Sequence, residues 1–136
     1  MAEDSTTPDA VELTRRLSRA DMDETITFYA PDTVFEIVGS GTFEGHAAIR
    51  ESLADWLVGY EAYDEEVDEV LHLGGGVVYA AVRANCRPVG SDPDVRVSQT
   101  HGFVFVWSSG RVTYGALYGD TDEARIAAER LAAERG

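Results

Sequence analysis

The chain has 136 residues, 44% of them hydrophobic, which suits one domain with one core and is short for two. Acidic residues outnumber basic ones by 25 to 11, and the net charge of −14 disfavours binding to nucleic acid or to anionic membranes. The single cysteine, Cys86, excludes an intramolecular disulfide, and no Cys/His cluster has the spacing of a zinc site.

The N-terminal segment, residues 1–21, is polar and acidic. It has neither the basic start nor the apolar stretch of a secretory signal, and no run of 18 apolar residues occurs in the sequence. We therefore expect a cytoplasmic protein that does not enter a membrane, folded as a single domain over residues 1–136.

The first half of the chain predicts three helices and two short strands. Apolar residues at helical spacing after Pro8 predict a helix over residues 8–20, and Asp21 can cap a second helix that ends before Pro31. Residues 33–38 are rich in β-branched and aromatic residues and predict a strand, which a glycine turn separates from a shorter one over 42–44. Residues 45–60 place apolar side chains on one face and predict the third helix.

The second half predicts four strands and a terminal helix. The strands cover residues 63–73, 77–87, 95–107 and 111–120, separated by two glycine-containing turns and one longer loop. Residues 124–135 have one apolar and one charged face and predict a helix that Thr121 or Asp122 caps. Helices followed by antiparallel strands and a closing helix indicate the α+β class.

Two segments carry a resemblance to a known superfamily. The first is YAPDTVFEIVG at residues 29–39, which GHAAIR follows at 45–50, and the second is GRV at 110–112 followed by YGD at 118–120. Both resemble motifs of SnoaL-like proteins, which belong to the superfamily of ketosteroid isomerase and nuclear transport factor 2 (NTF2). The resemblance implies a cone-shaped NTF2-like fold, in which a strongly bent antiparallel sheet wraps around the N-terminal helices and leaves an apolar pocket, with a C-terminal helix.

The resemblance also implies a range of functions, because membership of this fold does not fix a reaction. We expect a cofactor-free acid/base enzyme, of isomerase or cyclase type, that acts on a small hydrophobic carbonyl compound. A non-catalytic domain that binds a hydrophobic ligand or dimerises is the alternative. A limonene-type epoxide hydrolase is a third reading, with Arg83, Arg96 and Asp120 as candidates for its Asp-Arg-Asp set.

Glu36 is the candidate proton-transfer residue. In the ketosteroid isomerases the position that it resembles holds the carboxylate that shuttles the proton, and burial in an apolar cavity raises the pKa of such a group. Alternation along the strand supports another reading, in which Phe35 and Ile37 face the core and Glu36 faces solvent. Both readings stay open at this point.

His101 is the candidate electrophilic donor. The ketosteroid isomerases stabilise the enolate with a tyrosine of the first helix and a protonated aspartate. The resemblance puts Leu13, which has no donor, near the first of these positions and Thr100 or His101 near the second. On a regular strand His101 shares a face with Phe103. An imidazole bound to a backbone carbonyl, or lying at a dimer surface, is the alternative.

Asp120 and a group of aromatic residues complete the candidate site. SnoaL-like cyclases place an acid near the pocket at the end of the last strand, where Asp120 lies, but an aspartate before Thr121 is also a helix cap. The aromatic side chains that either line the pocket or fill an ordinary core are Trp56, Tyr60, Tyr79, Phe103, Trp107 and Tyr118. No metal or cofactor is expected.

A homodimer through the sheet is the expected assembly, since related domains pair in this way. Val104, Val106 and their neighbours would otherwise expose an apolar strand face. The expected partners are therefore a small hydrophobic molecule and a second copy of the chain.

Overall fold

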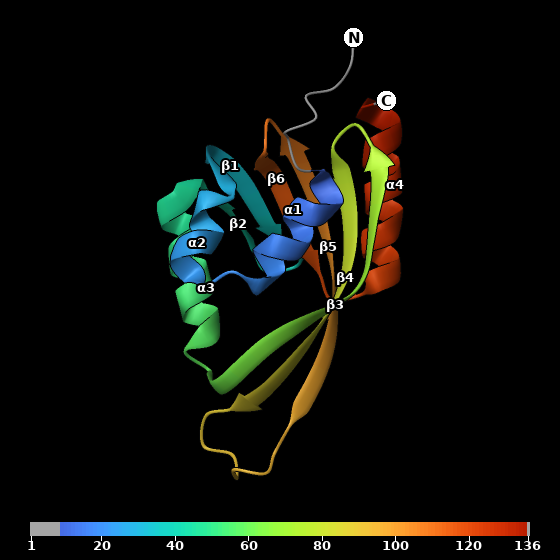
Figure 1. Cartoon of the computed structure of the whole chain (residues 1–136). Coiled ribbons are helices and arrows are strands. Elements are labelled where there is room, and N and C mark those ends of the chain that lie inside the picture. The colour runs from blue at the N-terminus through green and yellow to red at the C-terminus, as the bar shows by residue number, and fades with distance from the viewer. Residues whose placement is uncertain (1–8, 136) are drawn as a thin grey trace.

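The computed structural model describes residues 9–135. The predicted start of the first helix at Pro8 lies outside the described residues. The elements are α1 (Ala10–Arg19), α2 (Met22–Thr27), β1 (Tyr29–Ile37), β2 (Gly41–Glu44), α3 (Gly45–Leu57), β3 (Tyr60–Gly74), β4 (Val77–Pro88), β5 (Val97–Ser108), β6 (Arg111–Tyr118) and α4 (Thr121–Arg135). The strands form one curved sheet in the order β2-β1-β6-β5-β4-β3 (Figure 1). The predicted α+β class and order of elements are confirmed.

Aspartates begin the first two helices. The Asp9 carboxylate accepts a hydrogen bond from the backbone N–H of Glu12, and that of Asp21 accepts one from Glu24, both at 2.8 Å. Each bond satisfies a backbone donor that has no partner within the helix. The cap predicted at Asp21 is thereby confirmed, and it fixes the sharp turn between α1 and α2.

β1 begins earlier than the sequence predicted. We expected the second helix to continue almost to Pro31, but α2 ends at Thr27 and the strand starts at Tyr29. An extended backbone suits the residue before a proline, and a shift of register between Tyr29 and Val34 spans Pro31, which lacks an N–H to donate. The same strand pairs in parallel with β6, so the sheet is mixed rather than wholly antiparallel.

The third helix is shorter than predicted and the strand after it is longer. α3 stops at Leu57, and a turn through Gly59 leads into β3, which begins at Tyr60 instead of residue 63. β3 has 15 residues and pairs with β4 along most of its length. These two long strands and β5 extend below the helices in Figure 1 and form one end of the sheet.

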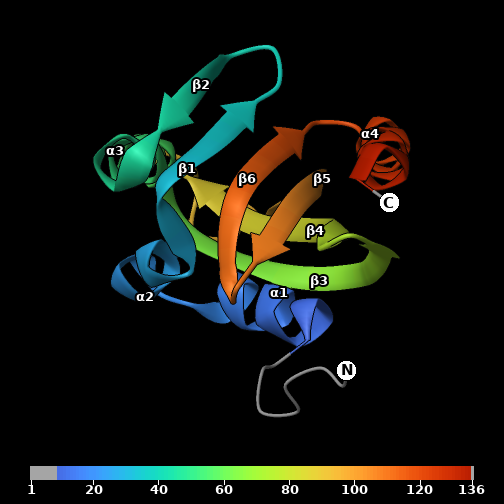
Figure 2. The ribbon, with the colours of Figure 1, turned by 90° about the horizontal axis from the view of Figure 1, so that it is seen from above.

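Helices cover the two faces of the sheet. On the inner, concave face, α1 packs against Val78, Phe105 and Trp107, and the Trp107 indole donates a hydrogen bond to the Thr14 hydroxyl at 3.0 Å. On the outer face, α4 packs against a separate apolar cluster. The view from above shows the strands curving between α4 on one side and the N-terminal helices on the other (Figure 2).

The outer cluster changes the argument for a dimer. Val104 and Val106 are only 2% and 3% exposed because α4 covers them, so the expectation that they present an apolar face was wrong. α4 approaches closely because β5 has a glycine there: a Cβ on Gly102 would lie 2.4 Å from the Cβ of Ala124. Dimerisation stays a prediction without that support.

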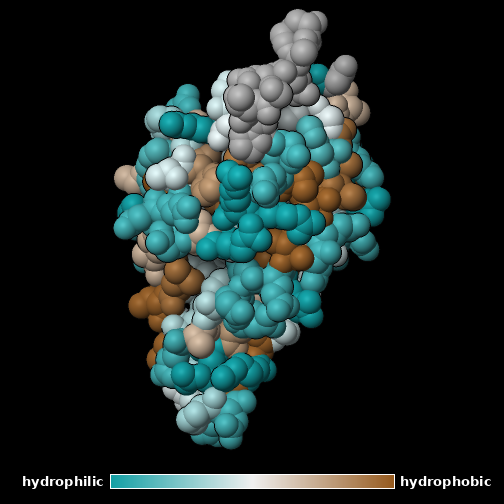
Figure 3. Space-filling view, in the orientation of Figure 1, coloured by the Kyte–Doolittle hydropathy of each residue, from teal (hydrophilic) through white to brown (hydrophobic). Residues whose placement is uncertain are grey.

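The surface is largely hydrophilic on the face that Figure 3 shows, with apolar residues in smaller groups. None of the described helices has the length and hydropathy needed to span a bilayer. Within residues 9–135, no group of three or more His, Cys, Asp or Glu side chains is placed to hold a metal ion.

Candidate functional site

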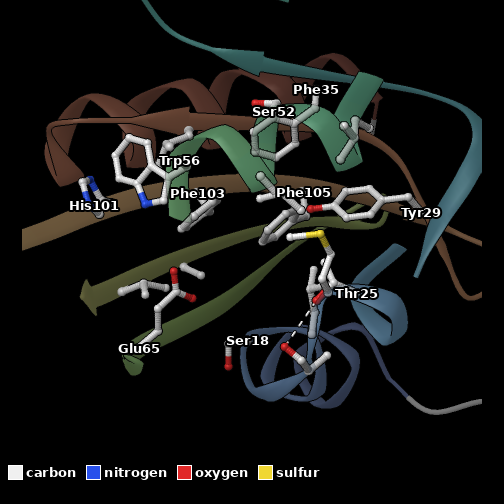
Figure 4. Close-up of a pocket in the computed structure, with 18 of the residues that line it drawn as sticks. Ser18, Thr25, Tyr29, Phe35, Ser52, Trp56, Glu65, His101, Phe103 and Phe105 are labelled. Atoms are coloured by element: carbon white, nitrogen blue, oxygen red, sulfur yellow. Dashed lines mark hydrogen bonds between the residues drawn. The ribbon is translucent and has the colours of Figure 1, made fainter. Parts of the chain in front are cut away.

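A cavity of about 550 Å³ lies between the concave face of the sheet and the helices α1, α2 and α3 (Figure 4). This volume is in the usual range for pockets that bind small organic molecules. Much of the wall is apolar and includes Phe35, Ile37, Ile49, Leu53, Phe103 and Phe105. A polar group in such a wall lies in a medium of low dielectric constant. Its hydrogen bonds to a ligand are therefore stronger than in water.

β3 places one carboxylate in this cavity. Tyr63, Glu65 and Val67 alternate along the strand, are half-buried, and line the cavity together. The Tyr63 hydroxyl donates a hydrogen bond to Glu65 Oε2 at 2.8 Å. Burial raises the pKa of Glu65, and the hydrogen bond from Tyr63 acts in the opposite direction. Glu65 is thus a carboxylate with one oxygen held and the other, Oε1, available.

The acids on the other face of β3 are arranged differently. Arg83 forms salt bridges with Glu66 at 3.2 Å and Asp68 at 2.8 Å, and Arg87 pairs with Glu61. Among the described residues Glu65 has no such cation beside it. Arginines of β4 therefore pair with three of the acids of β3, whereas the inward-facing Glu65 has no such counter-ion among the described residues.

Tyr63 interacts with both Glu65 and Trp56. Burial and the Glu65 carboxylate raise the pKa of Tyr63, while a hydrogen bond with the Trp56 side chain lowers it. Trp56 comes from α3 and lies opposite β3 in the cavity wall (Figure 4). The hydrogen bond from Tyr63 orients the Glu65 carboxylate.

Tyr29, on β1, supplies a neutral hydroxyl to the cavity. Its ring is 5% exposed and meets Phe35 edge-on, with ring centres 6.2 Å apart, and Figure 4 shows its hydroxyl directed into the cavity. Burial and the charge of Glu65 raise the pKa of Tyr29, so the group keeps its proton and can donate it in a hydrogen bond. The Tyr29 carbonyl accepts a hydrogen bond of 2.7 Å from the His46 ring, which ties β1 to α3.

The structure places His101 in the cavity wall with Phe103, its neighbour on the same strand face. Its ring lies edge-on to Trp56, with centres 6.0 Å apart. Burial lowers the pKa of His101, which makes the neutral imidazole the dominant form at pH 7. Its Nε2 is buried and has no hydrogen-bond partner within residues 9–135.

Glu36 and Asp120 lie outside this cavity. Glu36 is on the outer face of β1, where it accepts a hydrogen bond of 3.2 Å from the Tyr114 hydroxyl, while its neighbours Phe35 and Ile37 face inward. Asp120 Oδ1 accepts hydrogen bonds from the backbone N–H groups of Asp122 and Glu123, at 2.8 and 3.0 Å, and so caps α4. The structure does not bring either carboxylate together with His101.

The predicted aromatic residues divide between the two faces of the sheet. Trp56 and Phe103 line the cavity, and Tyr60 lies behind Trp56 with ring centres 6.1 Å apart. Trp107 belongs to the inner core, whereas Tyr79 and Tyr118 lie on the outer face. The aromatic part of the cavity is therefore completed by residues not singled out in the sequence, among them Tyr29 and Phe105.

The residues proposed for an epoxide hydrolase are also apart from the cavity. Arg83 is bound to the outward acids of β3, and Arg96 donates to the carbonyl oxygens of Pro93 and Val95 in the loop before β5. Asp120 caps α4. These three residues do not form an Asp-Arg-Asp set.

Glu65 and Tyr63 were missed in the sequence, although a signal for them was present. β3 contains six acids, and reading it as one solvated acidic stretch hides the alternation of Tyr63, Glu65 and Val67 with charged residues. Tyr29 was missed because it was assigned to the end of a helix. The partial burial of alternate residues in β3 and the early start of β1 bring all three to the cavity.

Comparison with known proteins fits this architecture. The family model of the SnoaL-like domain matches residues 10–115, which include every strand of the sheet at least in part. The chain belongs to the SnoaL-like family. No curated protein matches its sequence.

Solved structures show the same fold. An NTF2-like protein of unknown function from Burkholderia pseudomallei superposes with a TM-score of 0.73 at 16% identity, over 86% of this chain and 95% of that one. An epoxide hydrolase from M. tuberculosis, described as LEH-like, gives 0.64 at 18% identity, over 95% of both chains. The epoxide hydrolase/cyclase-like enzyme SalBIII, described in pyran ring formation in the polyether salinomycin, gives 0.64 at 21% identity, over 79% of this chain and 84% of that one. The SnoaL-like chain thus has the NTF2-like fold that its sequence implied.

Proposed function

We propose that this SnoaL-like protein is an acid/base enzyme that removes a proton from a hydrophobic carbonyl compound and returns it at another position, as an isomerase or a cyclase does. The observation that carries the proposal is Glu65, a half-buried carboxylate without a counter-ion in a largely apolar cavity. A carboxylate whose pKa is raised by burial is a stronger base than one in water.

The proton-transfer step uses the two unequal oxygens of Glu65. Tyr63 holds Oε2, so Oε1 takes the proton from the carbon next to the substrate carbonyl. The electron pair of the broken C–H bond forms the enolate double bond, and the carbonyl oxygen takes up the negative charge. The protonated Glu65 then returns the proton to another carbon. In the cyclase case the enolate carbon attacks a second carbonyl group of the same molecule and closes a ring, and the alkoxide that forms takes the proton from Glu65.

Tyr29 is the donor for the enolate oxygen. Its hydroxyl lies in the cavity within electrostatic reach of Glu65, and its raised pKa keeps it protonated. A hydrogen bond from such a preorganised donor is stronger to an enolate than to a neutral carbonyl, so it lowers the barrier. The Tyr29 hydroxyl thus replaces the oxyanion-hole tyrosine of the ketosteroid isomerases, near whose position this chain has Leu13.

His101 is placed to bind a second polar atom of the substrate. It lies on β5, two strands from Glu65 on β3 and offset by two residues along the strand, which separates their backbones by roughly 12 Å. Within the described residues no hydrogen bond joins the Glu65 and His101 side chains. A flat bicyclic or larger substrate is long enough to contact both. The unpartnered Nε2 of a neutral imidazole can donate to or accept from such a molecule, according to its tautomer.

The proposal predicts that the protein exchanges the acidic C–H protons of an apolar ketone for deuterium. 2-Tetralone, an aromatic bicycle with activated C–H groups on both sides of its carbonyl, is the probe, and loss of the proton signals in D2O is followed by NMR. We expect exchange above the rate in buffer, saturating with the concentration of the ketone because it depends on binding in the cavity.

Two outcomes separate this function from its alternatives. Exchange no faster than that produced by an equal concentration of free acetate contradicts proton transfer in the cavity. If 2-tetralone binds without exchange, the result favours the domain that only binds a hydrophobic ligand.

A further inference from the structure

Negatively charged groups outnumber positively charged ones around the cavity. Three carboxylates line it, those of Asp21, Asp64 and Glu65, whereas Arg19 is the one cationic side chain that lines it within the described part of the chain. Arg19, Asp21 and Asp64 are all exposed, so only Glu65 has its charge in the sheltered interior. An exposed guanidinium is well solvated and attracts an anion weakly.

The hydrogen-bond donors inside the cavity are all neutral. The Tyr29 hydroxyl remains protonated, the Ser52 hydroxyl carries no charge, and His101 is neutral at pH 7 because burial disfavours its cationic form. These groups can replace water around a carbonyl, ester or amide. A carboxylate would lose its hydration without gaining a cation and would lie in the field of Glu65.

We propose that the cavity selects uncharged substrates and excludes their free carboxylic acids, so that any acid group of the natural substrate is present as an ester, lactone or amide. This substrate class rests on the same cavity as the proposed function, but it concerns binding and does not require turnover. The net charge of −14 acts in the same direction, since it lowers the local concentration of anions near the mouth of the cavity.

Matched naphthalene compounds test the selection. 2-Naphthamide and 2-naphthoate have nearly the same shape and differ in charge at neutral pH, and methyl 2-naphthoate is a second uncharged member. Equilibrium dialysis of the full chain at low ionic strength gives the three dissociation constants. We expect the amide and the ester to bind at least about tenfold more tightly than the carboxylate.

Two neighbouring substitutions assign the effect to the cavity. Glu65→Gln removes the inward charge, and we expect it to tighten the binding of 2-naphthoate several-fold while changing that of 2-naphthamide little. Glu66→Gln removes one charge from the next residue, on the outer face beside Arg83, and is expected to leave both constants unchanged. An equal gain in both variants would show that net charge alone, and not the cavity, sets the selection.

The proposal is overturned if wild-type protein binds 2-naphthoate as tightly as 2-naphthamide, or if none of the three compounds binds, because the uncharged members are expected to fit. The result is independent of catalysis. Preference for the amide without deuterium exchange of 2-tetralone would support the substrate class and contradict the acid/base function. Exchange of 2-tetralone without preference for the amide would support the acid/base function and contradict the substrate class.

Discussion

Replacement of Glu65 by glutamine is expected to lower the rate of deuterium exchange by about 10²- to 10⁴-fold, the usual contribution of a positioned general base. Glutamine has nearly the same shape and still accepts a hydrogen bond from Tyr63, so the wall of the cavity stays intact. Only the ability to accept the substrate proton is lost. The initial rate of exchange at a subsaturating concentration of 2-tetralone measures the effect.

Glu66→Gln is the matched control for this prediction. It changes the adjacent residue by the same atoms, but its side chain faces the other way and Arg83 keeps a second partner in Asp68. We expect its exchange rate to stay within about twofold of the wild-type rate, since surface substitutions of this kind alter stability and structure little. Equal loss in both variants would remove Glu65 from the mechanism.

The same Glu65→Gln variant is expected to be more stable than the wild type at neutral pH. Burial raises the pKa of Glu65 in the folded state above its unfolded value, so the folded chain binds this proton more tightly than the unfolded chain. The stability that this binding contributes is fully present below the unfolded pKa and is lost as pH rises through the folded pKa. Thermal unfolding should therefore show a Tm advantage for the variant that grows from mildly acidic to neutral pH. A constant difference across that range would contradict the raised pKa.

A marked effect on folding is expected at Gly102. A methyl group there would lie 2.4 Å from the Cβ of Ala124 and 3.1 Å from the Cα of Thr121, so α4 has to move away from β5. Alanine restricts the unfolded chain more than glycine, which favours folding by less than about 1 kcal/mol, whereas overpacking costs about 1–3 kcal/mol. We therefore expect Gly102→Ala to lower the free energy of unfolding, measured by urea denaturation.

Gly119→Ala provides the comparison. A Cβ at Gly119 meets no atom within 4 Å, and its backbone is outside the left-handed region, so we expect little change or a slight gain in stability. Because no residue of α4 lines the cavity, Gly102→Ala should retain its exchange rate at temperatures where it is folded. Gly102→Ala as stable as Gly119→Ala would show that α4 is not held as closely as described.

The sequence predicted the secondary structure better than the site. Periodicity and turn residues located all ten elements, because each depends mainly on neighbours in the chain, and the main errors came at Pro31 and at the end of α3. The inward position of His101 followed from simple alternation with Phe103. For Glu36 the same alternation with Phe35 and Ile37 pointed outward, as the structure shows, while the family resemblance favoured the pocket.

The groups that were not predicted depend on distant parts of the chain. Whether Glu65 faces a cavity is decided by the pairing of β3 with β4 and by the helices on that side of the sheet, and neither can be read from a run of acids. The roles of Glu65 and Tyr29 follow from burial, since a carboxylate or a phenol in water shows none of these pKa changes. Local patterns therefore located the strands, and long-range packing selected the residues that form the site.

The parallel pairing of β1 with β6 also bears on how the protein folds. Phe35 pairs with Gly115, so one wall of the cavity assembles only after the strand that contains residue 115 has been synthesised. Contacts this distant in sequence slow folding, because a long loop must close before they form. Until then the edge of β1 that pairs with β6 is free, and the apolar side chains beside it are open to aggregation. We therefore expect the yield of folded protein to depend on conditions that protect this late step, such as lower temperature during synthesis.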